Sequence, residues 1–281
     1  MVKRYLLILS AVLCALMLRA QESYKDAVRS AMLALEQDSL SRAEHLFMQA
    51  ISLEPSMISN CLLYQQIGQI QQCQGRYSDA MKSYNNGLTL APNTVSLLLR
   101  RAALNMDIGD DVHALSDYSR VLELQPGNSE ALLVRALLHT QARHYAEARS
   151  DYQQLIKLEP GNIKAHLGLA LLNDKSGRPR EAMEQMDALI RLYPSHHELY
   201  AVRGGMKQKR RQFEQALQDL NMAIELAPEV SDYYLSRANF YIETKRKELA
   251  KQDILKAISL GAKQEDVADA LQRDKKFHRP L

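Results

Sequence analysis

Residues 111–126 read DVHALSDYSRVLELQP, and the alanine, the final leucine and the proline of this stretch recur at a constant distance along most of the 281-residue chain. Six alanines are spaced by 34 residues and a seventh precedes them by 37: Ala43, Ala80, Ala114, Ala148, Ala182, Ala216 and Ala250. The proline keeps the same step: Pro55, Pro92, Pro126, Pro160, Pro194 and Pro228. A leucine recurs two residues before it: Leu53, Leu90, Leu124, Leu158, Leu192, Leu226 and Leu260. A fixed period of this length is typical of stacked helical hairpins.

Each period predicts two helices separated by a tight turn. With repeats that start at residues 24, 61, 95, 129, 163, 197 and 231, helix A covers repeat positions 1–14, the turn falls at 15 and 16, and helix B covers about 17–31. The alanine at position 20 lets the two helices approach closely, and the proline at position 32 ends helix B. Position 15 favours the left-handed backbone that glycine tolerates. Both glycines and cationic residues hold that position: Gly75, Gly109, Arg143, Gly177, Arg211 and Lys245.

These positions resemble the tetratricopeptide repeat, whose pattern has an aromatic residue at positions 4 and 24, a small residue at 8, alanine at 20 and proline at 32. The matching aromatic residues are Tyr64, Tyr200 and Tyr234 at position 4, and Phe47, Tyr84, Tyr118 and Tyr152 at position 24. The expected alanine at position 27 is replaced by Val121, Leu155 and Leu189 in three repeats. The resemblance implies an all-α fold, a right-handed α-solenoid of about seven helix-turn-helix repeats over residues 21–264. A capping helix and tail are expected over residues 265–281.

Arginine at position 7 and aspartate at position 23 occur together in four repeats and are both missing from the other three. The pairs are Arg101 with Asp117, Arg135 with Asp151, Arg203 with Asp219, and Arg237 with Asp253. Both positions lie equally far from the turn at position 15, so the two side chains should face each other across the hairpin. We therefore predict an ion pair inside each of these four repeats.

Residues 1–20 have the features of a secretory signal peptide. Lys3 and Arg4 precede an apolar run of 14 residues, shorter than the ~20 residues that a membrane-spanning helix needs. Ala20 supplies a small residue before the expected cleavage site. The Ala20–Gln21 junction resembles that of secreted proteins of the Bacteroidetes, which implies a periplasmic mature chain. A lipid anchor on Cys14 is the less favoured alternative, since a leucine precedes that cysteine where a small residue is required.

Charge and cysteine content argue against a nucleic-acid-binding protein and against a disulfide-bonded one. The chain has 36 basic and 33 acidic residues, and removal of residues 1–20 takes away three basic residues and no acids, which leaves a net charge of zero. This balance gives no support for a nucleic-acid partner. Cys61 and Cys73 both fall on one predicted helix, about 18 Å apart along its axis, which is too far for a disulfide bond.

The sequence holds no pattern typical of an enzyme. No glycine-rich phosphate loop follows a strand, and no serine or cysteine stands in a nucleophile motif. His196 and His197 are adjacent but have no second histidine at the spacing of a zinc-protease helix. The other histidines in the repeats fall at different repeat positions. We predict a non-enzymatic protein with no catalytic residues, no metal, no cofactor and no small-molecule substrate.

The inner face of such a solenoid is built from helix A, and here it carries glutamines in the second repeat and apolar residues in repeats 3 to 6. We predict that this concave face binds a peptide or helical segment of another protein of the cell envelope. The candidate binding residues are Gln65, Gln69, Leu99, Ala103, Leu133, Val134, Leu137, Leu167, Leu171, Val202 and Gly205. Gly168 and Gly205 should add room for a ligand. Packing between repeats, without any groove, is the alternative explanation for the apolar set.

A basic rim is the competing docking surface. Cations gather at the turns between helix A and helix B of the last three repeats: Arg178, Arg180, Lys207, Lys209, Arg210, Arg211, Lys245, Arg246 and Lys247. Stacked turns form one edge, which would contact an acidic partner or an anionic lipid surface near the envelope membrane, or would only be solvated. The alternative function is thus a structural adaptor that self-assembles or docks by this rim, with no peptide groove.

Overall fold

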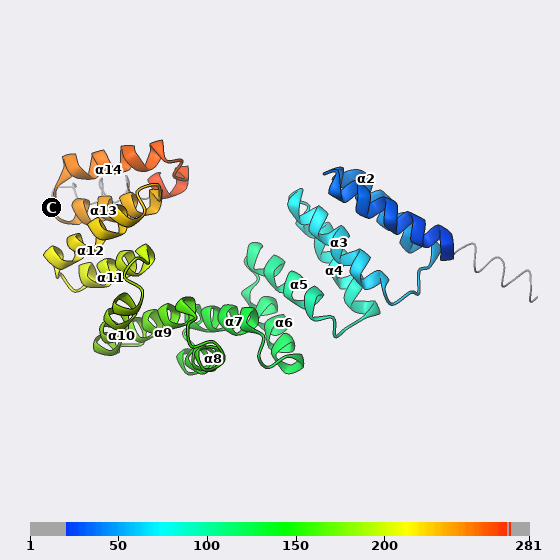
Figure 1. Ribbon diagram of the computed structural model, residues 1–281, viewed down its shortest axis with the longest axis horizontal. Coiled ribbons are helices and arrows are strands. Elements are labelled where there is room, and N and C mark those ends of the chain that lie inside the picture. Colours follow the sequence, from blue (N-terminus) through cyan, green and yellow to red (C-terminus); the bar gives the residue numbers. More distant parts are fainter. Residues whose placement is uncertain (1–20, 269, 271–281) are drawn as a thin grey trace, which may run out of the picture. The chain divides into compact units, whose positions relative to one another are not determined.

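Helical hairpins follow one another through residues 21–268 and 270, the part of the chain that the computed structural model describes (Figure 1). The first hairpin joins helical residues 21–36 to α2 (Leu40–Leu53). The next three are α3 (Asn60–Cys73) with α4 (Tyr77–Leu90), α5 (Val95–Asp107) with α6 (Asp111–Leu124), and α7 (Ser129–Gln141) with α8 (Tyr145–Leu158). The last three are α9 (Ile163–Lys175) with α10 (Pro179–Leu192), α11 (His197–Lys209) with α12 (Phe213–Leu226), and α13 (Ser231–Glu243) with α14 (Lys247–Ser259). The predicted all-α repeat fold is confirmed.

Contacts divide the chain into two units, Met1–Leu138 and His139–Leu281, and the boundary falls inside α7. Within each unit, a helix packs on its hairpin partner and on the next helix along the chain. Residues 264–268 are also helical, and Val267 and Ala270 pack against a cluster that includes Tyr234 and Ile254. The expected signal peptide, 1–20, and the tail, 271–281, lie outside the described residues.

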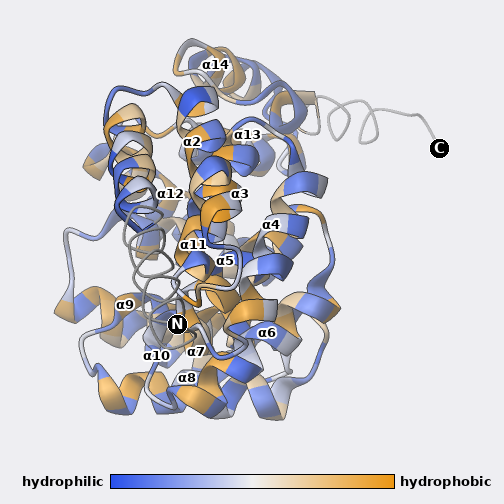
Figure 2. Ribbon diagram, turned by 90° about the vertical axis from the view of Figure 1, so that its right-hand side faces the viewer, coloured by the Kyte–Doolittle hydropathy of each residue, from blue (hydrophilic) through white to orange (hydrophobic). Residues whose placement is uncertain are grey.

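Burial follows the repeat positions. The alanines at position 20 are all between 0% and 2% exposed, so helix B contacts helix A at closest range there. Tyr84 and Tyr118, at position 24, are buried in the layer between hairpins. Each helix therefore carries hydrophobic and hydrophilic residues on different sides (Figure 2), as expected of amphipathic helices that bury one face.

The turn at position 15 has the same left-handed backbone in every repeat. The φ angles there are 54° at Asp38, 74° at Gly75, 78° at Gly109, 62° at Arg143, 81° at Gly177, 59° at Arg211 and 62° at Lys245. Residues other than glycine thus adopt a conformation that costs them roughly 1–2 kcal/mol. The hairpin geometry imposes this backbone whichever residue holds the position.

Arginine at position 7 joins two hairpins rather than one. Arg203 donates from Nε and Nη2 to the Asp219 carboxylate, 16 residues later, at 2.9 and 2.7 Å, and from Nη1 to Asp187, 16 residues earlier, at 2.7 Å. Arg101 and Arg237 repeat this pattern with Asp117 and Asp253 ahead, and with Asn85 and Asn221 behind.

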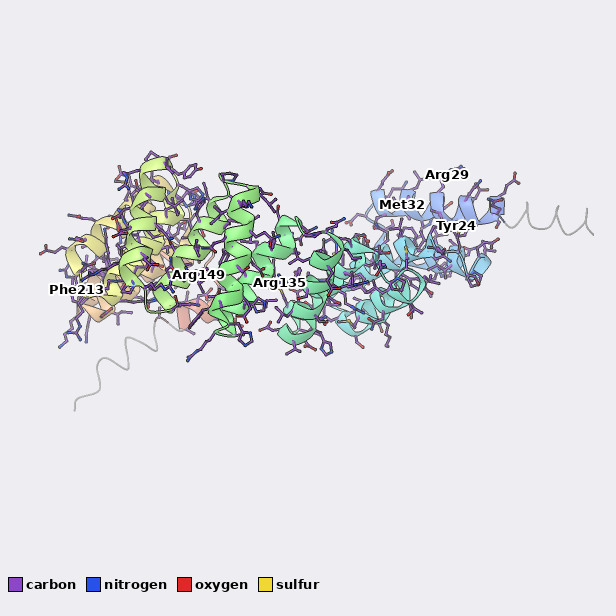
Figure 3. All side chains as sticks on the ribbon, turned by 90° about the horizontal axis from the view of Figure 1, so that it is seen from below. Tyr24, Arg29, Met32, Arg135, Arg149 and Phe213 are labelled. Atoms are coloured by element: carbon purple, nitrogen blue, oxygen red, sulfur yellow. The ribbon has the colours of Figure 1, made fainter. Side chains whose placement is uncertain are left out.

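Three of the four predicted ion pairs are therefore confirmed. Arg135 (Figure 3) donates to Ser119 behind it at 3.3 Å. Its predicted partner, Asp151, belongs to the other unit, so that pair stays a prediction. The sequence did not predict the second acceptor, which lies at position 25 of the preceding repeat.

Two repeats that lack this pair contain a neutral replacement, which involves position 11 of helix A. The Ser83 hydroxyl donates to Gln71 at 2.8 Å, and the Asn173 amide donates to Gln185 at 2.9 Å. Ser83 and the aspartates at position 23 are buried and Gln185 is half-buried, so the polar group at this position needs a partner.

Candidate functional site

The predicted peptide-binding residues fall into two groups, one in each unit. The first unit holds Gln65, Gln69, Leu99, Ala103, Leu133, Val134 and Leu137, and the second holds Leu167, Leu171, Val202 and Gly205. In both units they come from helix A, because repeat positions 5, 6 and 9 lie on neighbouring turns of one helix.

The glutamines of α3 already have partners on the next helix A. The Ser96 hydroxyl donates to the Gln65 amide oxygen at 2.6 Å. With its amide oxygen turned toward Arg100, Gln69 accepts from that guanidinium at 3.1 and 3.2 Å. These contacts join α3 to α5, so a ligand that binds the glutamines has to share or exchange them.

The apolar residues of the first unit are open in part. Leu137, one of the predicted binding residues, is 43% exposed. Leu99, Leu133 and Val134 are half-buried, as is Ala103. This strip can contact both the protein core and an external apolar side chain.

In the second unit the predicted residues pack more deeply. Leu167 is 6% exposed, and Leu171 and Val202 pack against the same cluster of buried residues, which includes Met186 and Leu199. These three side chains therefore contribute to the core between α9, α10 and α11.

The two glycines that should add room differ from each other. A Cβ atom on Gly205 would meet no heavy atom within 4 Å, so the surface there is open. A Cβ on Gly168 would lie 2.4 Å from the ring of Tyr152, so that space is filled by the protein itself. The expectation that Gly168 adds room for a ligand was wrong.

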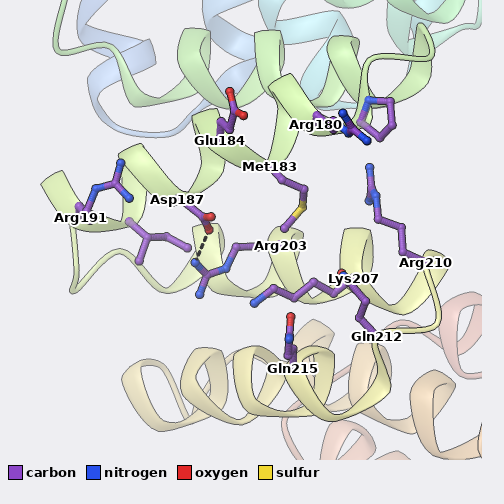
Figure 4. Close-up of a pocket in the computed structure, with 12 residues that line it drawn as sticks. Arg180, Met183, Glu184, Asp187, Arg191, Arg203, Lys207, Arg210, Gln212 and Gln215 are labelled. Carbon is purple, nitrogen blue, oxygen red and sulfur yellow. Dashed lines mark hydrogen bonds and ion pairs between the residues drawn. The ribbon is translucent and has the colours of Figure 1, made fainter.

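A separate groove lies on the helix-B side of the second unit (Figure 4). It has a volume of about 730 Å³ and is formed by α10, α11 and α12. Met183 and Ile190 supply apolar surface, and five cationic side chains line it: Arg180, Arg191, Arg203, Lys207 and Arg210. Sequence reasoning missed this groove, because its residues come from three helices at repeat positions that also serve in packing.

Three cations assigned to the rim line this groove: Arg180, Lys207 and Arg210. Lys207 Nζ lies 2.8 Å from an Asp219 oxygen, and Arg210 pairs with Asp174 on α9. Burial acts to lower the pKa of Arg203, but its hydrogen bonds with Asp219 and Asp187 outweigh that effect and raise the pKa. Arg180 is exposed, and so are the remaining predicted rim residues, which lie outside the groove: Arg178, Lys209, Arg211, Lys245, Arg246 and Lys247.

Residues 21–268 and 270 contain neither a metal-binding cluster nor a membrane-spanning helix. No group of three or more histidine, cysteine, aspartate or glutamate side chains is placed to hold a metal ion there. No helix in that range combines the length and the apolar character needed to cross a membrane. Cys61 is buried and Cys73 is exposed, and both are free thiols.

Comparison with known proteins finds the same repeat. Two family models described as tetratricopeptide repeat match, one over residues 139–204 and the other over 63–94 and 231–263. A search of curated proteins found no match. A solved tetratricopeptide repeat protein from Parabacteroides merdae is 26% identical, with a TM-score of 0.81 over 90% of this chain and 99% of that one.

More distant structures share the fold. MamA from Desulfovibrio magneticus is 21% identical with a TM-score of 0.55, and the match covers 62% of this chain and 97% of that chain. The pilF protein of Pseudomonas aeruginosa is 15% identical with a TM-score of 0.53, over 75% of this chain and 96% of that chain.

Proposed function

Because this chain belongs to the tetratricopeptide repeat family, we propose that it is a scaffold of the cell envelope that binds a polypeptide segment of another protein on its helix-A face. Proteins built from this repeat generally mediate protein–protein interactions and are generally non-enzymatic. The proposal adds the binding face, the kind of ligand and the compartment.

The observation that carries the proposal is the open surface at Gly205. A glycine inside a helix costs roughly 1 kcal/mol relative to alanine. Its neighbour Gly204 has a packing reason, since a Cβ there would lie 3.1 Å from Leu220. Gly205 has no such neighbour. Clearance for the backbone of a bound peptide supplies the missing reason, with the half-buried Val202 beside it for apolar contact.

The experiment uses the mature chain and a partner recovered by pull-down from envelope extract, followed by titration of the purified pair. Gly205→Leu fills the open surface, and Val202→Asp places a charge beside it. Gln218→Leu, on the exposed side of α12, is the matched control because it adds the same side chain elsewhere.

We expect Gly205→Leu to lower affinity by at least about tenfold, or ~1.4 kcal/mol, with a melting temperature no lower than that of the wild type, while the control binds normally. Val202 packs against the core, so its variant counts only if it melts like the wild type. Intact affinity in both folded variants would refute the helix-A groove and leave the exposed rim cations as the docking surface.

Localisation is tested separately. Lys3, Arg4 and the apolar run that follows support export with cleavage after Ala20. The N-terminal sequence of the chain recovered from the envelope fraction should begin at Gln21. Unprocessed protein in the cytoplasm would contradict export.

A further inference from the structure

We propose that the groove formed by α10, α11 and α12 is a second binding site, which takes a short extended acidic peptide segment. It is distinct from the helix-A face. Arg203 and Lys207 line the groove and each lies two residues from Gly205 on α11, which is about 200° around a helix. The two surfaces therefore lie on opposite sides of α11.

Two carboxylates, Glu184 and Asp187, line the groove together with its five cations; Asp187 accepts from Arg203, and Glu184 is exposed. The cations themselves fall into a paired set and an unpaired set. Arg203, Lys207 and Arg210 each pair with a carboxylate of the protein, which holds their long side chains in place. Arg180 and Arg191 are exposed and take part in no ion pair among the described residues. An incoming carboxylate can pair with these two arginines without displacing any contact of the fold.

The chain contains a version of the same groove with fewer cations, which serves as an internal comparison. In the first unit, α4, α5 and α6 form a groove of about 390 Å³ lined by residues at equivalent repeat positions. Asn105 and Ile108 stand there in the places of Lys207 and Arg210. The positions equivalent to Arg180 and Arg191 carry Ser78 and Thr89. A groove between two B helices thus forms without these cations, so the fold does not require them.

The apolar floor and the charge spacing define the peptide. Arg180 and Arg191 stand at opposite ends of the groove (Figure 4) and are 11 residues apart on α10, or about 16 Å along its axis. An extended chain covers this distance in about five residues. Met183 and Ile190 between them suit an apolar side chain. The geometry therefore fits six residues with a carboxylate at each end and an apolar residue in the middle.

The test is fluorescence anisotropy with a labelled, end-capped peptide, Glu-Gly-Leu-Gly-Gly-Glu, and its counterpart with glutamine at both ends. The proteins are the wild-type mature chain, the double variant Arg180→Glu with Arg191→Glu, and the control double variant Lys164→Glu with Lys209→Glu. The control residues are exposed, belong to the same unit and lie outside the groove, so the change in net charge is identical. Melting temperatures verify that all three proteins are folded.

We expect the acidic peptide to bind the wild type and the control within about twofold of each other, and the groove variant at least about tenfold more weakly. Equal binding of the glutamine peptide, equal loss in the control, or no binding to the wild type would each overturn the proposal. The proposal would also be overturned if the wild-type protein bound phosphatidylglycerol vesicles but not the acidic peptide. Gly205→Leu should leave peptide binding unchanged, which separates this site from the helix-A face.

Discussion

Asp219 illustrates how much a single buried side chain controls within a repeat. It is 5% exposed and accepts hydrogen bonds from Arg203, while Lys207 lies 2.8 Å away. Removing one partner of a buried ion pair leaves an uncompensated charge, which is much more costly than losing a pair at the surface.

Asp219→Ala should therefore lower the free energy of unfolding by about 3–5 kcal/mol, measured by urea denaturation followed by circular dichroism. The matched control is Asp26→Ala, which breaks an exposed pair with Arg29 whose side chains are 69% and 73% exposed. That change should cost about 0–1 kcal/mol. Similar losses in the two variants would show that the buried network contributes no more than a surface pair.

The burial of Tyr118 makes the free energy of unfolding depend on pH. Burial raises its pKa to about 12, above the value of about 10 for an unfolded tyrosine. The neutral phenol is thus favoured by the folded state. Its contribution is fully present below pH ~10 and is lost as the pH rises toward ~12, because the unfolded chain gives up the proton first.

Tyr118→Phe should make the free energy of unfolding fall less steeply between pH 10 and 12. The cost at neutral pH should be small, since the hydroxyl contacts only the Met106 sulfur at 3.7 Å. Tyr77→Phe, at a side chain that is 44% exposed, is the control for the substitution itself. An identical slope in Tyr118→Phe would contradict the assignment.

The sequence predicts part of this residue-scale network. Arginine at position 7 and aspartate at position 23 can be recognised as a pair because they occur together in four repeats and are both missing from the other three. The further acceptors at position 25 of the preceding repeat were missed because several residue types can accept from the arginine there: Asn85, Ser119, Asp187 and Asn221. Any side chain with an oxygen acceptor can serve at position 25, so no single residue type recurs there in the sequence.

At the level of the helix, the 34-residue period predicts nearly every boundary. What it does not reveal is which neighbour fills the space beside a glycine. Gly168 looked like an open position, yet the ring of Tyr152 from the preceding repeat occupies that space. Such a contact depends on the packing of two hairpins, and the spacing of residues within one repeat does not contain it.

Matched alanine substitutions on α9 and α11 test this difference. Gly205→Ala should raise stability by about 0.5–1 kcal/mol, because the helix gains propensity and the new methyl group meets nothing. Gly168→Ala should lower stability by about 1–3 kcal/mol, because the ring of Tyr152 has to move. Thermal unfolding of both proteins gives the sign directly, and a stabilised Gly168→Ala would show that the ring yields freely.

At the scale of the molecule, the division into two units was not predictable. The period continues through α7 without a break in composition, so nothing in the sequence marks residue 138 as a boundary. The predicted binding residues were treated as one face for the same reason, although they belong to both units. The basic groove lies wholly in the second unit, where each of its walls is defined.

Counting thiols tests the state of the whole chain. The mature protein should contain two cysteines, because the expected cleavage removes Cys14. In the folded protein without reductant, a thiol reagent should react quickly with the exposed Cys73 and slowly with the buried Cys61. Denaturation should then bring the total to two. A third thiol would indicate that the signal segment is retained, and a total below two would indicate oxidation.

The arginine contacts also determine where the chain can change its length. Arg101, Arg203 and Arg237 each reach 16 residues forward and 16 residues back, so an extra residue between a repeat and its predecessor would shift one acceptor out of reach. The 37-residue first repeat is followed by Ile67 at position 7, where no such contact exists to be broken. The repeat after Pro160 has Leu169 at position 7 and so also lacks this contact, which leaves the connection after Pro160 free to change in length. Insertions in related chains should accordingly gather at these two junctions, and the connections after Pro92, Pro126, Pro194 and Pro228 should keep a constant length.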